Sequence, residues 1–161
     1  MKNRQNGFSL IELLIVVVII GIIAAIAIPN LLASRRSANE GSAVSAMRTV
    51  HGAQMTYAST YGGGNYSPDI ATLGGGLGLV DATLAGGNKS GFTFVTSGTN
   101  FTPTAPATFV ASCVPNTSTG ITATGTRRFG IATDGVIRFD TANLSTQFTE
   151  ATVSAATALA N

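Results

Sequence analysis

An uninterrupted apolar run from Leu13 to Ile28 constrains this chain more than any other feature, because it contains no polar side chain. The segment from Phe8 to Ile28 has 21 residues. As a helix rising about 1.5 Å per residue it would be about 31 Å long. The hydrocarbon core of a bilayer is about 30 Å thick. The run can therefore span a membrane as one helix.

Glu12 is the one ionisable side chain in this segment. A carboxylate near the middle of a bilayer costs on the order of 3 kcal/mol unless it has a partner, so an intramembrane carboxylate is a functional hypothesis by default. The apolar helix itself offers no cation to Glu12. A partner from another molecule is therefore expected.

The N-terminal pattern resembles the class III leader of type IV pilins and pseudopilins. The matching residues are the basic Lys2 and Arg4, then Gly7, then Phe8-Ser9-Leu10-Ile11-Glu12 and the apolar run. In that family a prepilin peptidase cuts after the glycine on the cytoplasmic side, and the new amine is methylated. The resemblance implies cleavage between Gly7 and Phe8 and N-methylation of Phe8. It also implies that Glu12 pairs with the Phe8 amine of a neighbouring subunit, which would neutralise the buried carboxylate and set the axial stagger.

Gly21 and Pro29 also match the family pattern. Pro29 has no N–H for the carbonyl of Ala25, so the helix is expected to bend there or to loosen between Gly21 and Pro29. The resemblance implies that this segment melts on assembly. A simple proline kink in a continuous helix is the alternative.

Two other interpretations of the N-terminal segment remain. Ala25-Ile26-Ala27 could be the cleavage site of an ordinary secretory signal, which would release a soluble protein beginning at Ile28. The apolar run is longer than the usual signal core of about 7–15 residues, and Glu12 has no role in a discarded peptide. In a plain single-span anchor, Glu12 would be a cost without a benefit.

The charge balance gives no support for a nucleic-acid surface. Two of the nine basic residues, Lys2 and Arg4, belong to the leader, so the mature chain has seven basic and seven acidic side chains. By the positive-inside rule the leader stays cytoplasmic and the bulk of the chain lies outside. With only 10% charged residues, the exterior should be neutral and polar, which suits side-by-side packing of subunits.

Beyond Pro29 the pattern becomes amphipathic and predicts one helix from about Phe8 to Tyr61, ended by three glycines. Apolar residues recur at spacings of three and four with one polar interruption, and this stripe is expected to face a core. The stripe consists of Ala43, Met47, Val50, Gln54, Tyr57 and Tyr61. The charged and polar residues expected on the other side, or near the membrane, are Arg35, Arg36, Asn39, Glu40 and Arg48.

Residues 62–91 are rich in glycine and predict a connecting loop with a helical turn or two. Residues 92–140 predict antiparallel strands, with the best-defined hairpin from Arg127 to Asp140. A three-residue loop with Gly135 in the left-handed conformation would pair Phe129 with Phe139 and Ile131 with Ile137, which puts all four on one face. This hairpin is similar to that of pilins with small globular heads. Residues 141–161 are rich in Ala and Thr and predict a weakly ordered surface tail.

No catalytic or metal site emerges from the sequence, and no cofactor is expected. Cys113 is the single cysteine, so the intrachain disulfide common in pilins cannot form, and a buried core thiol is expected. His51 has no second histidine or nearby cysteine for a metal site, so a structural role is expected. The Tyr57–Tyr61 pair is interpreted as helix-to-sheet packing, with electron transfer as an alternative.

The predicted fold class is α+β, with a long N-terminal helix packed on a small antiparallel sheet. The segments are the leader (1–7), the membrane-spanning half of the helix (8–28), its amphipathic half (29–61), the loop (62–91), the sheet (92–140) and the tail (141–161). The predicted function is that of a filament subunit. Its partners would be copies of itself, prepilin peptidase, an inner-membrane assembly platform and the bilayer, and it would reach the cell surface after assembly. A type II secretion pseudopilin or a minor pilin that binds DNA or surfaces is the alternative.

Overall fold

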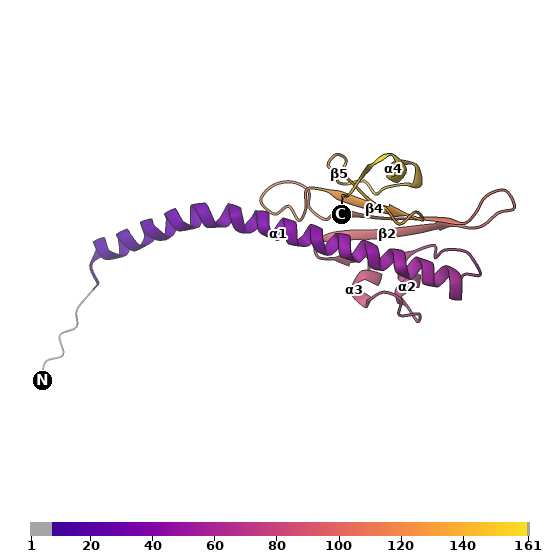
Figure 1. Cartoon of the computed structure of the whole chain (residues 1–161). Helices are drawn as coiled ribbons and strands as arrows, with labels where there is room; N and C mark the ends of the chain where they lie inside the picture. The colour runs from indigo at the N-terminus through magenta and orange to yellow at the C-terminus, as the bar shows by residue number, and fades with distance from the viewer. Residues whose placement is uncertain (1–7, 161) are drawn as a thin grey trace, which may run out of the picture. The chain divides into compact units, whose positions relative to one another are not determined.

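The computed structural model describes residues 8–160, and Gly7 and the rest of the predicted leader lie outside them. The chain divides into two compact units between Ser34 and Arg35. Helix α1 (Leu10–Thr60) is followed by α2 (Ile70–Gly74), α3 (Ala82–Ala85), β1 (Asn88–Lys89), β2 (Phe92–Thr99), β3 (Thr108–Pro115), β4 (Arg128–Ala132), β5 (Ile137–Asp140), α4 (Glu150–Ala155) and β6 (Thr157–Ala158). The α+β class is confirmed (Figure 1).

The first unit contains the N-terminal part of α1. The predicted helix from about Phe8 to Tyr61 is confirmed to within two residues at each end. Its helical structure continues without interruption through Gly21 and Pro29, so loosening of this segment stays a prediction for another state. The side-chain amide of Asn30, the residue that follows the proline, donates to the carbonyl of Ile26 one turn earlier, at 3.0 Å.

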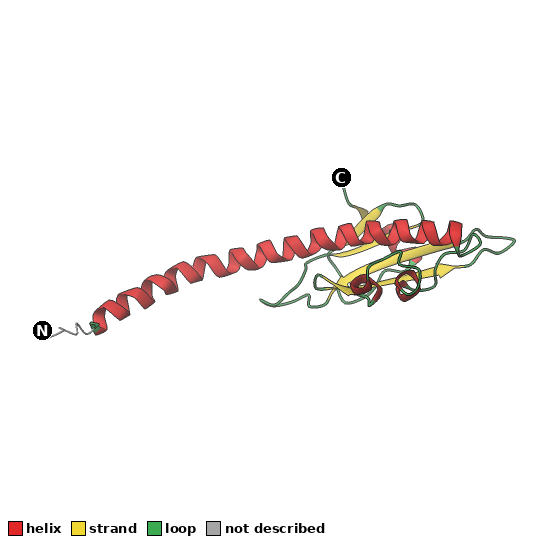
Figure 2. Cartoon of the chain, turned by 90° about the horizontal axis from the view of Figure 1, so that it is seen from below, coloured by secondary structure: helices red, strands yellow, loops and turns green. Residues whose placement is uncertain are grey.

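The second unit is built on a six-stranded antiparallel sheet in which the strands follow chain order from β1 to β6. Residues of α1 from Ala43 onward pack against one face of the sheet, and α4 covers part of the other (Figure 1). Alternate residues of β4 point to opposite faces of the sheet. Phe129 and Ile131 pack in the core with residues of α1, whereas Gly130 lies against Phe148 near α4. Figure 2 shows the strands and the two short helices α2 and α3 from below.

The hairpin of β4 and β5 has the predicted register. Phe129 pairs with Phe139 and Ile131 with Ile137, and Gly135 has a φ of 72°. The hydrophobic alternation therefore predicts the loop length correctly. Phe139 departs from the expectation in one respect, because its side chain is only partly buried at the edge of the core.

The segment between α1 and β2 forms two helical turns, as the glycine-rich pattern predicts. α2 and α3 each begin at an aspartate whose side chain accepts a hydrogen bond from a backbone N–H of the first turn, at Asp69 and Asp81. Leu73 and Leu84 of these helices are fully buried in the main core. The segment thus covers an edge of the core instead of merely linking the helix to the sheet.

The prediction of a weakly ordered C-terminal tail is wrong. Residues Phe148 and Val153 are buried, α4 begins with a capping box at Thr149, and β6 pairs with β5. The segment is short of large apolar residues, but these two suffice because Gly130 of β4 leaves room for both: a Cβ there would lie within 2.8 Å of each side chain. The low apolar content of the segment hid this complementarity.

Candidate functional site

The beginning of α1 holds the predicted assembly residues. Phe8 is exposed, and the backbone N–H of Ser9 donates to Oε2 of Glu12 at 3.1 Å. This is one half of a capping box, in which a glutamate three residues into the helix satisfies the N–H of the N-cap residue. An ionised carboxylate has about four acceptor sites. Glu12 is exposed and so keeps room for a further donor.

An exposed apolar surface follows Glu12 along α1. The helix contains a stretch that is long and apolar enough to cross a membrane, close to the N-terminus, and none of that stretch is buried within the protein. The large side chains on it are Leu13, Leu14, Ile15, Val16, Val17, Val18, Ile19, Ile20, Ile22, Ile23, Ile26 and Ile28. Soluble monomers rarely expose a contiguous apolar patch larger than a few hundred Å². A surface of this kind is typical of a segment that lipid or other helices cover.

Glu40 ties α1 to the start of β4. Its carboxylate pairs with the Arg127 guanidinium at 2.7 Å, and Oε1 accepts from the backbone N–H of Thr126 at 2.7 Å and from its hydroxyl at 2.9 Å. Arg127 is held in turn over the rings of Phe129 and Phe139, at 5.5 and 5.4 Å from their centroids. Glu40 was expected on the polar side of the helix or near the membrane, and that expectation is wrong.

The pKa of Glu40 reflects this environment. Burial of the carboxyl opposes ionisation, but the hydrogen bonds from Thr126 and Arg127 outweigh burial and hold the pKa below its ordinary value. The sequence carried a signal for this site, because Glu40 lies three residues before Ala43 and so continues the apolar stripe by one turn. A charged residue in register with a core stripe predicts a buried ion pair.

Gln54 provides a second polar contact between α1 and the rest of the head. Its side chain is fully buried. It donates to the Ser67 carbonyl at 3.2 Å and to the Thr96 hydroxyl at 3.0 Å, and it accepts from the Ser67 N–H at 2.8 Å. Both ends of the amide are thus satisfied, as a buried amide requires. The polar interruption of the stripe is a specific link between helix, loop and sheet.

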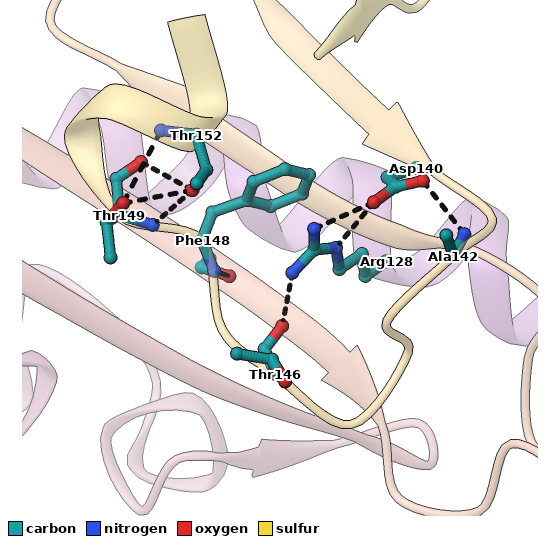
Figure 3. Close-up of polar contacts among 8 residues, drawn as sticks. Arg128, Asp140, Ala142, Thr146, Phe148, Thr149 and Thr152 are labelled. Atoms are coloured by element: carbon teal, nitrogen blue, oxygen red, sulfur yellow. Dashed lines mark hydrogen bonds and ion pairs between the residues drawn. The ribbon is translucent and has the colours of Figure 1, made fainter. Parts of the chain in front are cut away.

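Arg128 anchors the C-terminal segment (Figure 3). Its guanidinium, which is buried, pairs with Asp140 at 2.7 Å and donates to the Thr146 carbonyl at 2.7 Å. It also lies 4.0 Å from the centroid of the Phe148 ring. A hydrogen bond from the neighbouring Ala142 N–H and the Arg128 pair together lower the pKa of Asp140. This set of contacts closes the C-terminal part of the head without a disulfide.

The remaining candidate residues have structural positions. Cys113 is fully buried, and burial raises the pKa of its thiol well above the ordinary value. His51 packs against Phe109 with ring centroids 5.6 Å apart. Tyr57 packs on the core whereas Tyr61 is exposed. Within residues 8–160, no three His, Cys, Asp or Glu side chains come together as a metal-ligand set.

Comparison with known proteins identifies the N-terminal segment. Residues 2–28 match the family described as the prokaryotic N-terminal methylation motif. Over 40 residues, 25% of this chain and 30% of the relative, the chain is 62% identical to the type IV wide pilus major component PilA4 of Thermus thermophilus. Over 56 residues, 35% of this chain and 26% of the relative, it is 45% identical to the type IV major pilin protein PilA of Myxococcus xanthus.

Proteins of type II secretion are also among the relatives, over segments of similar length. The core protein G of that system from Aeromonas hydrophila is 46% identical over 44 residues, 27% of this chain and 31% of the relative. The matches thus span about a third of the length of these curated relatives. No solved structure matches the chain significantly. The resemblance to the type IV pilin and pseudopilin family is confirmed for the N-terminal segment.

Proposed function

We propose that this chain is a structural subunit of a type IV pilus or a related bacterial filament. Prepilin peptidase cuts it between Gly7 and Phe8, and the new Phe8 amine is methylated. Before assembly the apolar half of α1 holds the subunit in the inner membrane, where an assembly platform extracts it into a filament of identical copies at the cell surface. Its role is mechanical, and the proposal assigns it no catalytic residue and no cofactor.

The observation that carries the proposal is an exposed carboxylate at the start of an exposed apolar helix that matches the N-terminal methylation motif. Glu12 uses one oxygen for the Ser9 N–H and has acceptor capacity left for the Phe8 amine of a neighbouring subunit. That contact neutralises both charges as the helices pack together. In the filament, neighbouring helices replace lipid around the apolar surface, and Gly21 and Pro29 allow the segment between them to loosen.

A pseudopilin of a type II secretion system is the second candidate. It is favoured by the similarity to core protein G from several bacteria. The assembly contact would be the same, because it lies within the N-terminal methylation motif, which contains Phe8 and Glu12. Electron microscopy of sheared cell-surface fibres, with mass spectrometry of their subunit, distinguishes the two candidates: a pilus subunit is recovered in long fibres, and a pseudopilin is not.

The assembly contact is tested by Glu12→Ala in the bacterium that produces the protein. An unpaired neighbouring amine would then have to enter the packed helices, which typically costs about 3–5 kcal/mol. The variant should accumulate in the membrane as the wild type does, with Phe8 as its first residue by mass spectrometry, but it should be absent from the sheared fibres. Normal amounts of fibre would show that Glu12 is not the assembly contact.

Glu12→Gln is the matched control, because the amide oxygen still accepts from the Ser9 N–H while the charge is lost. If pairing with the amine is what assembly needs, this variant fails as Glu12→Ala does. Fibres from Glu12→Gln, but not from Glu12→Ala, would instead assign the residue to helix capping and refute the charge pair.

A further inference from the structure

An exposed loop of the head carries an isolated apolar side chain. Residues 116–125, called here the 116–125 loop, connect β3 to the segment before β4 and contain no charged residue. The loop is closed at its base, where the Thr124 N–H donates to the Thr117 carbonyl at 2.8 Å. Ile121 at its tip is 77% exposed. The folded head gives this side chain little cover.

The 116–125 loop is attached to the first turns of α1 in this unit. Arg36 donates from Nη2 to the Gly120 carbonyl at 2.8 Å and from Nε to the Ala123 carbonyl at 3.2 Å. Asn39 donates to the Thr124 carbonyl at 3.1 Å. The Gly120 carbonyl belongs to the peptide bond that leads into Ile121. Arg36 therefore fixes the apolar tip of the loop beside the basic pair Arg35–Arg36, of which Arg35 is exposed.

This part of α1 lies a short way along the chain from the apolar run. Arg36 follows Ile28 by eight residues, so the chain between them spans at most about 26–29 Å. The polar headgroup region adds about 5–8 Å on each side of the hydrocarbon core. Arginine carries its charge on a long stem and commonly reaches back toward the membrane surface. Arg35 is thus within reach of lipid phosphates, and so is a loop attached to its neighbour.

We propose that the 116–125 loop is a membrane-contact element, which inserts Ile121 into the headgroup region of the bilayer while Arg35 binds the phosphates of anionic phospholipids. The inference rests on the membrane anchoring proposed above. An apolar side chain in a loop without charged residues, attached beside Arg35 and Arg36, matches both the apolar and the anionic character of that surface. The contact holds the head of the unassembled subunit close to the membrane.

The chain contains no tryptophan, so a single substitution creates a specific fluorescent probe. Ile121→Trp is compared with Phe101→Trp, which replaces another exposed side chain (65%) at the β2–β3 connection, where its N–H bonds to Asn65 beyond the end of α1. Each full-length variant is reconstituted in vesicles of phosphatidylcholine and phosphatidylglycerol that contain lipids brominated near the top of the acyl chain. Both substitutions are at exposed sites, and circular dichroism checks that the head is folded.

The fluorescence of Ile121→Trp should be quenched at least about twofold more strongly than that of Phe101→Trp, with emission shifted to shorter wavelength, because tryptophan partitions to the membrane interface. Adding Arg36→Gln to Ile121→Trp removes the two bonds to the loop and should bring the quenching down toward that of Phe101→Trp. Equal quenching of the two single variants, in chains that float with the vesicles, would overturn the inference and leave the anchoring intact. Chains that do not float with the vesicles would overturn the proposed anchoring itself.

Discussion

Replacing Glu40 by Gln tests whether the ion pair with Arg127 holds α1 on the head. The Glu40 side chain is 6% exposed and that of Arg127 is 37% exposed. An exposed pair contributes about 0–1 kcal/mol, and breaking a fully buried pair costs about 3–5 kcal/mol. Because Arg127 can regain water and the new amide oxygen still accepts from Thr126, we expect a loss between these limits, about 2–3 kcal/mol of the free energy of unfolding.

The effect should depend on pH. The folded-state pKa of Glu40 is below its ordinary value of 4.5, so the folded state binds its proton less readily than the unfolded state does. The charge therefore stabilises the fold above about pH 4.5, and this contribution is lost as the pH falls through the folded-state pKa. The difference between wild type and Glu40→Gln should be full at pH 7 and should shrink in acid below pH 4.5.

Thermal unfolding of the full chain in detergent, followed by circular dichroism, measures the effect. For a head of this size, 2–3 kcal/mol corresponds to a lower midpoint by about 6–12 °C. Lys89→Gln is the matched control, because it removes one charge of the exposed Lys89–Asp81 pair, and its midpoint should stay that of the wild type. A midpoint for Glu40→Gln within 1 or 2 °C of the wild type, or a deficit that persists unchanged in acid, would refute the reasoning.

Two further predictions concern the sheet. Phe129→Ala should lower the free energy of unfolding by about 3–5 kcal/mol, because the Phe129 ring is fully buried. Phe139→Ala should lower it by about half as much, because the Phe139 ring is only partly buried. Equal losses of the two variants in denaturant titrations would contradict this difference. Gly130→Ala would place a Cβ 2.8 Å from the Phe148 ring, so chymotrypsin should cut at Phe148 faster. Gly41→Ala is the control, because a Cβ at Gly41 would meet nothing within 4 Å. This substitution should stabilise the helix by about 0.5–1 kcal/mol. Equal rates of cleavage of the two variants would argue against the Gly130 contact.

The sequence predicts those parts of the fold that repeat a pattern. The spacing of Met47 and Val50 identifies the buried face of α1, and the alternation around Gly135 gives the hairpin register, because in both cases one residue's position implies the next. The Glu12 motif is equally local, being contained in a few consecutive residues. Such patterns can be recognised without knowledge of the tertiary structure.

The parts that the sequence did not predict depend on single residues that are far apart in the chain. Phe148 is buried because Gly130, on another strand, leaves space for its ring. Glu40 is buried because Thr126 and Arg127, more than eighty positions away, supply its hydrogen bonds. The register of the apolar stripe indicates that Glu40 is buried, but no period or motif identifies its partners or the partner of Phe148. The low apolar content of the C-terminal segment and the charge of Glu40 taken alone both predict exposure, and contacts with distant residues bury Phe148 and Glu40 instead.

The two buried polar contacts of α1 also determine which turn of the helix meets the sheet. Small and apolar residues repeat along the stripe, so sliding the helix by one turn would put similar side chains against the same core. The positions of Glu40 and Gln54 are not interchangeable in this way. A slide by one turn would take Glu40 from Arg127 and Gln54 from Ser67, which would leave a charge and an amide buried without partners, at a cost of several kcal/mol. Apolar packing drives the helix onto the head, and these two side chains select its register.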